Sequence, residues 1–342
     1  MATWSTNPFA HALYADGVRR HHDRAAAQAQ REPDGGGRPR RLLIVTSQNW
    51  NFLTNLLDHY AQDDSAFEVR TFDFSSVQEA LDGDIHAIFA PQSMGVSDEA
   101  MWARISALSP TFRELVEWSD TVLCEWAGAH ALWLSRYLPS SARLVIRLHS
   151  YEVFSQWPLF MNWGGVDGVV FVADHIRQFA RLQYGLDRYD WIDTTVVPNF
   201  NHLEKFLRPK TSRAARTLGM VGYNNWNKDP LFGVRVLEAL AAEDPDWRLV
   251  LVGHPWTEDS KPKEAAYRAA FHEAVEQAGL ADRIEYRGHT RDLPAVFEDI
   301  GFVLSTSWRE GTHETILEGM ASGAVPVIRR WPMTQPFGAP ET

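Results

Sequence analysis

Short apolar runs alternate with segments of helical periodicity through the first two hundred residues. The first run, Leu42-Leu43-Ile44-Val45-Thr46, has no polar alternation, which is typical of a central parallel strand. A helical segment follows at residues 52–62, where leucines and a tyrosine recur three and four positions apart. Further strands are expected at residues 67–74, 85–89, 121–124, 143–148, 168–172 and 194–197, and further helices at 109–117 and 174–184. Strands that alternate with helices predict a doubly wound α/β domain.

The same pattern returns from residue 217 onward. Strands are expected at residues 217–221, 247–252, 284–286, 302–304 and 325–328, and helices at 231–242, 264–278, 293–298 and 312–322. In the last helix Thr312 is the expected N-cap, and Gly323 lies where a C-cap glycine belongs. The fold class is therefore α/β, with two Rossmann-like domains facing across a cleft.

The domain boundaries follow from breaks in this pattern. Residues 1–40 read as a flexible lead-in, 41–201 as the first domain, 202–217 as a basic linker and 218–342 as the second domain. The lead-in carries Arg19, Arg20 and Arg24 among seven arginines, which suit peripheral contact with an anionic membrane surface. A solvated tail is the alternative that composition favours.

Composition narrows the class of protein. A net charge of −11 argues against a general nucleic-acid binder. The single Cys124 excludes an internal disulfide and a cysteine metal cluster, which fits a reducing cytosol. Neither a basic-then-apolar leader nor a membrane-spanning run is evident, so a cytoplasmic location is expected.

Two acids mark the candidate site in the second domain. Glu310 follows a strand at its carboxyl end, where open α/β sheets bind ligands, and Glu318 lies eight positions later. On a helix Glu318 would be roughly 9–12 Å along the axis. The N–H groups of the first helical turn lie between them and suit a phosphate. A ligand with sugar, diphosphate and ribose in sequence would fit, whereas the plainer alternative is two surface acids on an amphipathic helix.

Five motifs in order resemble the retaining GT-B glycosyltransferases of family 4. They are RLHSYE, VVPNFN, VGYNNWNKD, LVLVGHPW and REGTHETILEGMASGAVPVI, the last matching the Glu-x7-Glu signature, and they cover residues 42–328. The resemblance implies transfer of a sugar from a nucleotide-diphosphate sugar with retained configuration, and neither a required metal nor a cofactor. It implies that the second domain holds the donor and the first the acceptor. It also implies a further strand and helix, so the second domain is expected to be incomplete.

The resemblance also implies roles for single residues. Lys228 neutralises the leaving diphosphate, Glu310 contacts donor sugar hydroxyls, Glu318 accepts hydrogen bonds from the ribose, and His149 ends a first-domain strand at the reacting centre. Further donor-binding residues are Gly222 of the phosphate loop, the backbone of Gly311, Thr312 and His313, and the hydroxyl of Thr315.

Departures from the family pattern leave other readings open. Tyr223 stands where the family usually has an arginine, and Arg287 or His313 is the expected substitute for that cation. Glu125 and Trp126 are candidates for the acceptor side. The acceptor class, whether glycan, lipid-linked or small molecule, stays open. The alternatives to an active transferase are a non-catalytic GT-B subunit that binds a partner or a sugar nucleotide, and a GT-B phosphorylase or epimerase.

Overall fold

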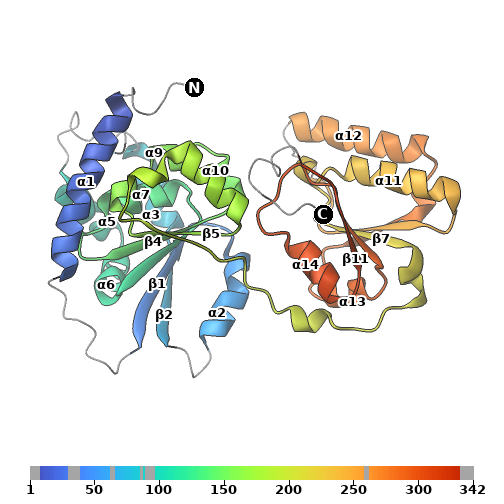
Figure 1. Cartoon of the computed structure of the whole chain (residues 1–342), viewed down its shortest axis with the longest axis horizontal. Helices are drawn as coiled ribbons and strands as arrows, with labels where there is room; N and C mark the ends of the chain where they lie inside the picture. Colours follow the sequence, from blue (N-terminus) through green and yellow to red (C-terminus); the bar gives the residue numbers. More distant parts are fainter. Residues whose placement is uncertain are drawn as a thin grey trace. The chain divides into compact units, whose positions relative to one another are not determined.

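The computed structural model describes residues 8–29, 39–61, 66–84, 88, 97–257 and 262–331. The chain divides into two compact units, Met1–Phe200 and Asn201–Thr342. Each unit is built around one parallel sheet with helices packed on its faces (Figure 1). The two-domain α/β architecture that the sequence predicts is therefore present, and each unit is described by itself.

The first unit contains a six-stranded sheet with the order β2-β1-β3-β4-β5-β6, and all of its strand pairs are parallel. The strands are β1 (Arg40–Thr46), β2 (Phe67–Asp73), β3 (Thr121–Glu125), β4 (Arg143–Leu148), β5 (Gly168–Phe171) and β6 (Asp193–Val196). Alternate residues of β1 enter different cores. Leu43 and Val45 join the large core, whereas Leu42 and Ile44 pack against Leu53 on the other face.

Helices cover both faces of this first sheet. Their bounds are α1 (Pro8–Ala29), α2 (Thr54–Tyr60), α3 (Ser75–Leu81), α5 (Asp98–Leu108), α6 (Pro110–Trp118), α7 (Ala129–Tyr137), α8 (Ser150–Val153), α9 (Trp157–Phe160) and α10 (Asp174–Tyr184). The strand expected at residues 85–89 lies outside the described residues except for Ile88, which is helical. The sequence pattern did not predict α7, because that helix is buried on nearly every side and shows no polar face.

The N-terminal lead-in is helical over Pro8–Ala29, which corrects the expectation of a flexible segment. This helix, α1, crosses the loop at Gly164 so closely that a Cβ on Gly164 would lie 1.9 Å from the Cα of Gly17. Arg20 pairs with Asp98, and the buried Arg24 pairs with Asp167. These two arginines hold the helix on the first unit, so they are not free for the membrane contact expected of them.

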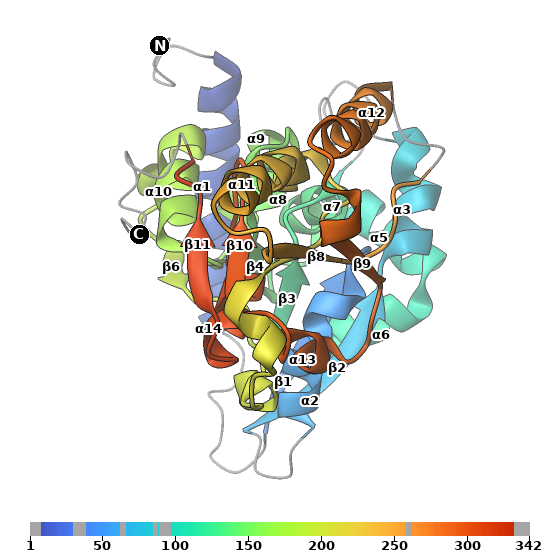
Figure 2. The same ribbon diagram turned by 90° about the vertical axis from the view of Figure 1, so that its right-hand side faces the viewer.

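The second unit contains a five-stranded parallel sheet with the order β11-β10-β7-β8-β9. Its strands are β7 (Thr217–Val221), β8 (Arg248–Val252), β9 (Ile284–Gly288), β10 (Phe302–Ser305) and β11 (Val325–Ile328). Its helices are α11 (Pro230–Glu243), α12 (Pro262–Gln277), α13 (Leu293–Phe297) and α14 (Glu314–Ala321). Figure 2 turns this unit towards the viewer and places α14 beside the neighbouring strands β10 and β11.

Alternate strand residues fill two separate cores of the second unit. Leu249 and Leu251 of β8 join the core under α11 and α12, and Val250 and Val252 join the core under α13 and α14. On the second face α14 approaches β10 closely. A Cβ on Gly319 would lie 2.5 Å from Val303, so glycine is the residue that permits this approach.

The segment expected as a linker belongs structurally to the second unit. It contains two 3-10 turns, Leu203–Phe206 and Ser212–Arg216. Phe206 is buried in the core under α13 and α14. Lys210 donates through Nζ to the carbonyl oxygens of Phe297 and Ile300, each at 2.7 Å. The lysine thereby satisfies carbonyl groups at the end of α13.

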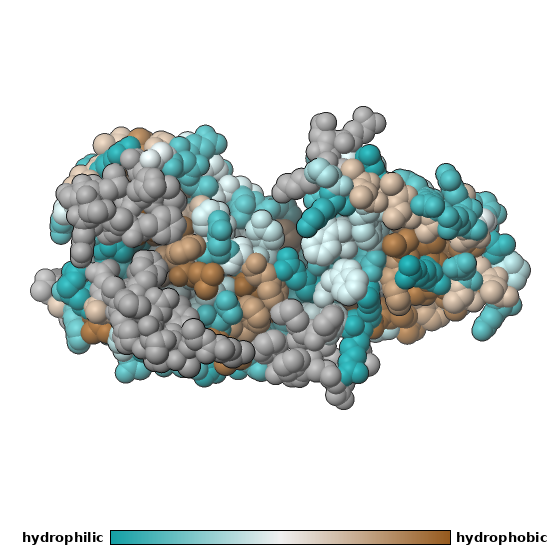
Figure 3. Space-filling view, turned by 90° about the horizontal axis from the view of Figure 1, so that it is seen from above, coloured by the Kyte–Doolittle hydropathy of each residue, from teal (hydrophilic) through white to brown (hydrophobic). Residues whose placement is uncertain are grey.

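No helix among the described residues is long and apolar enough to cross a bilayer. On the face shown in Figure 3, hydrophilic and hydrophobic residues are interspersed over both units.

Candidate active site

Lys228 and Glu310 meet at the carboxyl ends of two neighbouring strands. Lys228 ends a 3-10 turn after β7, and Glu310 lies in the loop after β10, which pairs directly with β7. The Lys228 Nζ lies 2.6 Å from the Glu310 Oε1, and the Ser307 hydroxyl donates to the same oxygen at 2.5 Å. Both charged side chains keep some exposure, 31% for the lysine and 13% for the glutamate. The two residues that the sequence singled out 82 positions apart are thus in contact.

Backbone and side-chain hydrogen bonds fasten the two loops to each other. The N–H of Trp308 donates to the carbonyl of Asn227 at 2.8 Å, and the Asn227 amide donates to the carbonyl of Arg309 at 3.0 Å. The buried Thr306 hydroxyl contacts the carbonyls of Lys228 and Asp229. The spacing between Lys228 and Glu310 is therefore set by the loop backbones as well as by charge.

Gly222 lies beside the stem of Lys228. Its φ of +78° is in the left-handed region that favours glycine, and a Cβ there would lie 3.8 Å from the Lys228 Cε. The Gly222 N–H donates to the carbonyl of Val252 at 2.8 Å, which fixes the turn after β7 to the end of β8. Gly222 therefore lies next to Lys228, and its part in a phosphate loop stays a prediction.

Two residues of this site were missed by the sequence reasoning. Asp229 is buried with φ +48° and occupies the N-cap position of α11, and its carboxylate accepts a hydrogen bond from Arg329 Nη1 at 2.5 Å. The Arg329 guanidinium also stacks 4.0 Å from the ring centroid of Trp308. A signal for Arg329 existed, because it directly follows the predicted strand 325–328 and so falls at the same sheet edge.

Glu318 lies on α14, and its carboxyl has an unusual proton affinity. Burial, reinforced by the negative charge of Glu314 and opposed by Lys205, raises the pKa of Glu318 to about 7. The expected N-cap was wrong by one residue, because α14 begins at Glu314 with His313 as its N-cap. The predicted stop at Gly323 is confirmed by its φ of +82°.

The remaining residues expected around the phosphate lie near the start of α14. Gly311 and Thr312 form the bend before it, and Thr315 is in its first turn. The His313 ring packs edge-on against Trp331 with 5.5 Å between ring centroids. Their roles toward a ligand stay predictions.

The structure does not bring Arg287 to Lys228. Arg287 lies near the end of β9, which is an edge strand of the sheet and does not neighbour β7, and it pairs there with Glu285 and with Asp299. Tyr223, at the position of the family's arginine, is buried in the α11–α12 core, where it packs against Trp256, and it also contacts the exposed Tyr286. That position is therefore a core position here, and Arg287 is committed to an ion-pair network.

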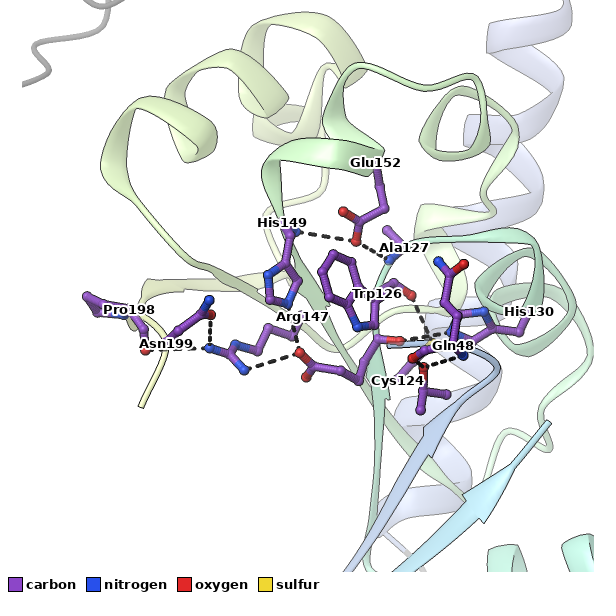
Figure 4. Close-up of polar contacts among 12 residues, drawn as sticks. Gln48, Cys124, Trp126, Ala127, His130, Arg147, His149, Glu152, Pro198 and Asn199 are labelled. Carbon is purple, nitrogen blue, oxygen red and sulfur yellow. Dashed lines mark hydrogen bonds and ion pairs between the residues drawn. The ribbon is translucent and has the colours of Figure 1, made fainter. Parts of the chain in front are cut away.

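His149 belongs to a separate polar cluster in the first unit (Figure 4). Its Nε2 lies 2.7 Å from the Oε1 of Glu125, which also accepts a hydrogen bond from Arg147 at 3.2 Å. Arg147 donates in addition to the Asn199 side-chain oxygen at 2.6 Å. All three charged or titratable groups are buried. Glu125 holds both partners at the carboxyl ends of β3 and β4, and a ligand would meet a His149 whose Nε2 is already engaged.

Trp126 and Glu152 complete this first-unit cluster. Trp126 has a φ of +71° and stacks on His149 with 3.9 Å between ring centroids. Glu152 forms a capping box with His149 at the start of α8 and accepts from the Ala127 N–H at 2.9 Å. Burial raises the pKa of Glu152, against the opposing influence of His149. The backbone strain at Trp126 marks the cluster as a tightly determined part of the unit.

A second histidine in Figure 4 is structural in character. His130 is fully buried, and burial lowers its pKa to about 4, so the ring is neutral at pH 7. Its Nε2 faces the carbonyl of Glu125 at 2.9 Å and its Nδ1 lies 3.0 Å from the Ser47 hydroxyl. These contacts require Nε2 to donate and Nδ1 to accept. The turn after β1 is thereby tied to the end of β3.

In the sequence comparisons with known proteins, the family match lies in the second unit. Residues 215–335 match the family model described as glycosyl transferases group 1. The GDP-mannose:cellobiosyl-diphosphopolyprenol alpha-mannosyltransferase of Xanthomonas campestris is 24% identical over 135 residues, which are 39% of this chain and 33% of that protein. The match thus spans about a third of the length of the curated relatives.

Solved structures with the same architecture extend over both units. HepE of Anabaena in complex with UDP is 18% identical, with a TM-score of 0.60 over 87% of this chain and 82% of HepE. A trehalose-phosphate synthase of Burkholderia vietnamiensis is 12% identical, with a TM-score of 0.59 over 87% of this chain and 85% of that one. At these identities the likeness establishes the fold. Residues 215–335 are therefore similar to the glycosyl transferases group 1 family, and the chain as a whole has the GT-B fold.

Proposed function

We propose that the chain is a retaining glycosyltransferase that moves a sugar from a nucleotide-diphosphate sugar to a glycan, lipid-linked or small-molecule acceptor. The observation that carries this proposal is the contact between Lys228 and Glu310 at the carboxyl ends of β7 and β10. Ligands of open α/β sheets bind at this edge. The lysine there suits the diphosphate of a donor, and the carboxylate next to it suits the hydroxyl groups of the donor's sugar.

The chemistry explains why a lysine is needed. Breaking the bond between the anomeric carbon and the diphosphate leaves negative charge on the departing phosphate. A fixed ammonium group stabilises that charge without reorganising during the reaction. Lys228 is held in place by its loop and lies next to Gly222, where the absence of a side chain leaves room for a phosphate.

The ion pair with Glu310 does not prevent this role. A partly exposed pair of this kind contributes only about 1 kcal/mol or less. A diphosphate carries more negative charge than one carboxylate, so it competes effectively for the lysine. Glu310 then turns its acceptor oxygens to sugar hydroxyls, with Ser307 still bonded to one of them.

Glu318 and the start of α14 supply the remaining donor contacts in this proposal. The first-turn N–H groups of α14 face the phosphates, and Glu318 accepts hydrogen bonds from the ribose hydroxyls. Relatives support the donor class: one is named for GDP-mannose, and HepE was solved with UDP and glucose. We therefore propose a UDP- or GDP-sugar donor, and the first unit as the acceptor side, with a catalytic role for His149.

A non-catalytic GT-B subunit that binds a sugar nucleotide is the second candidate. The arginine that the family usually has after the loop glycine is replaced here by the core residue Tyr223. The expected substitute, Arg287, is paired with Glu285 and Asp299, and both observations favour a subunit without catalytic activity. The two candidates separate on turnover, since the subunit would bind donor without cleaving it. A cytoplasmic location and the lack of a required metal stay part of the proposal, and so does peripheral membrane contact, in which Arg20 and Arg24 have no part.

The test is donor binding and hydrolysis by the wild type and two variants. UDP-glucose and GDP-mannose are titrated by calorimetry, and release of nucleoside diphosphate is followed by chromatography. Lys228→Ala should weaken donor binding about 10- to 100-fold, because a charge-assisted hydrogen bond is worth about 1.5–3 kcal/mol. The matched control is Lys263→Ala, an exposed lysine of the same unit. Equal affinity and turnover in wild type and Lys228→Ala would remove the proposed role of Lys228.

A further inference from the structure

Two exposed tryptophans flank the ion pair of the candidate site. Trp226 is 46% exposed and Trp308 is 41% exposed, and the other tryptophans of the described ranges are more deeply covered. A tryptophan has a large apolar surface, so two of them exposed on neighbouring loops at one sheet edge suit a ligand that covers them. Neither residue has a part in the proposed donor contacts.

The two tryptophans occupy equivalent positions on paired loops. Trp226 precedes Lys228 by two residues, and Trp308 precedes Glu310 by two residues. The loops are joined at Asn227, whose carbonyl accepts from the Trp308 N–H and whose amide donates to the carbonyl of Arg309. Both tryptophans therefore belong to one hydrogen-bonded pair of loops, which also carries Lys228 and Glu310.

One face of Trp308 is supported from behind. The Arg329 guanidinium lies 4.0 Å from the ring centroid of Trp308, and Arg329 is anchored in turn by Asp229. A cation over one face fixes the plane of an indole and leaves the other face to a ligand. The exposed indole of Trp308 is thus already held in place by Arg329. A ligand that packs on it would therefore cost little side-chain entropy.

We propose that Trp226 and Trp308 form a sugar-binding platform on which the C–H face of a pyranose ring packs. A pyranose presents an apolar face of axial hydrogens and a polar rim of hydroxyls. The platform supplies aromatic faces, and Glu310 and Lys228 on the same two loops supply an acceptor and a donor for the rim. This inference rests on the proposed function, and it adds the residues that recognise the sugar itself.

The bound ring belongs either to the donor or to the acceptor, and binding measurements separate the two sources. The variants are Trp226→Ala, Trp308→Ala and Trp308→Phe, with Leu207→Ala as the control for loss of an exposed apolar side chain of the same unit. Each protein is titrated by calorimetry with UDP, UDP-glucose, GDP and GDP-mannose. Methyl α-glucopyranoside and cellobiose are then titrated into the protein saturated with UDP.

A donor platform predicts that the alanine variants bind UDP and GDP as the wild type does, but bind the favoured nucleotide-sugar about five- to tenfold more weakly. Trp308→Phe should recover most of the affinity, because a phenylalanine keeps a ring over Arg329. An acceptor platform predicts unchanged nucleotide-sugar affinity and an equivalent loss for the free saccharide. Trp226→Ala is the cleaner variant, since Trp308→Ala also removes the stacking of Arg329.

Outcomes for this inference and for the proposed function are distinguishable. If the wild type binds nucleotide-sugars and the alanine variants bind every ligand equally well, the platform is refuted and the proposed function stands. If the wild type binds no nucleotide and no nucleotide-sugar, the proposed function fails and the platform falls with it. A variant that loses UDP as well as UDP-glucose, with an unchanged melting temperature, would overturn the assignment to a sugar ring.

Discussion

Replacing Glu318 by glutamine should change how the stability of the second unit depends on pH. Burial raises the pKa of Glu318 from the ordinary 4.5 to about 7, with a contribution from Glu314. The unfolded chain therefore releases this proton well before the folded one does. The stability associated with the protonated carboxyl is fully present below pH 4.5 and is lost as the pH rises through 7. Glu318→Gln has no such proton to lose.

The magnitude follows from the two proton affinities. Each tenfold difference in the proton affinity of Glu318 between the folded and unfolded chain is worth about 1.4 kcal/mol. A pKa that rises from 4.5 to about 7 on folding therefore lowers the stability of the folded state with Glu318 ionised by about 3 kcal/mol at most. Glu318 keeps contact with solvent, which reduces the expected value to about 1–2 kcal/mol. The free energy of unfolding of Glu318→Gln should therefore rise relative to wild type by about 1–2 kcal/mol between pH 5 and pH 8.

The assay is urea unfolding of both proteins at pH 5, 6, 7 and 8, followed by circular dichroism, with the transitions of the two units fitted separately. Groups that titrate identically in both proteins cancel in the difference. Glu314→Gln is the matched control, because it removes the second cause and should lower the pKa of Glu318. A difference between wild type and Glu318→Gln that is flat across this range, or that favours wild type at high pH, would refute the reasoning.

Two further substitutions test the packing that supports the site. Arg24→Ala should lower the free energy of unfolding of the first unit by about 3 kcal/mol, because it removes the buried ion-pair partner of Asp167. Urea unfolding measures this loss, and an effect below about 0.5 kcal/mol would mean that α1 does not pack there. Gly319→Ala should cost about 1–3 kcal/mol and weaken UDP-glucose binding, because the new Cβ meets Val303 at 2.5 Å and α14 must move. Thermal unfolding measures the loss of stability, with Gly83→Ala as the control because a Cβ there meets nothing within 4 Å. Equal melting temperatures for both variants would contradict the close packing.

The sequence predicted the second unit well because its strands are short apolar runs between clear helices. Parallel strands bring their carboxyl ends to one edge, so the end positions of β7 and β10 were enough to place Lys228 near Glu310. Their direct ion pair was not predictable, because it depends on loop hydrogen bonds such as that from Trp308 to Asn227.

Other features lacked a readable pattern. The helix α7 is buried on nearly all sides, so it has no amphipathic period, and α1 is held by a glycine contact and two arginines that look like features of a solvated tail. Arg287 looked like a cation at a strand end, but its acidic neighbours Glu285 and Asp299 occupy it. Side-chain partners of this kind are a tertiary property that strand positions do not determine.

The most direct measurement of the central claim is calorimetric titration of the wild type and Lys228→Ala with UDP-glucose and GDP-mannose at low salt. The account predicts that the wild type binds at least one of these donors and that Lys228→Ala binds the same donor about 10- to 100-fold more weakly, while Lys263→Ala binds it normally. Failure of the folded wild type to bind any nucleotide-sugar, or binding by Lys228→Ala that matches the wild type, would contradict the claim that Lys228 and Glu310 form a donor site.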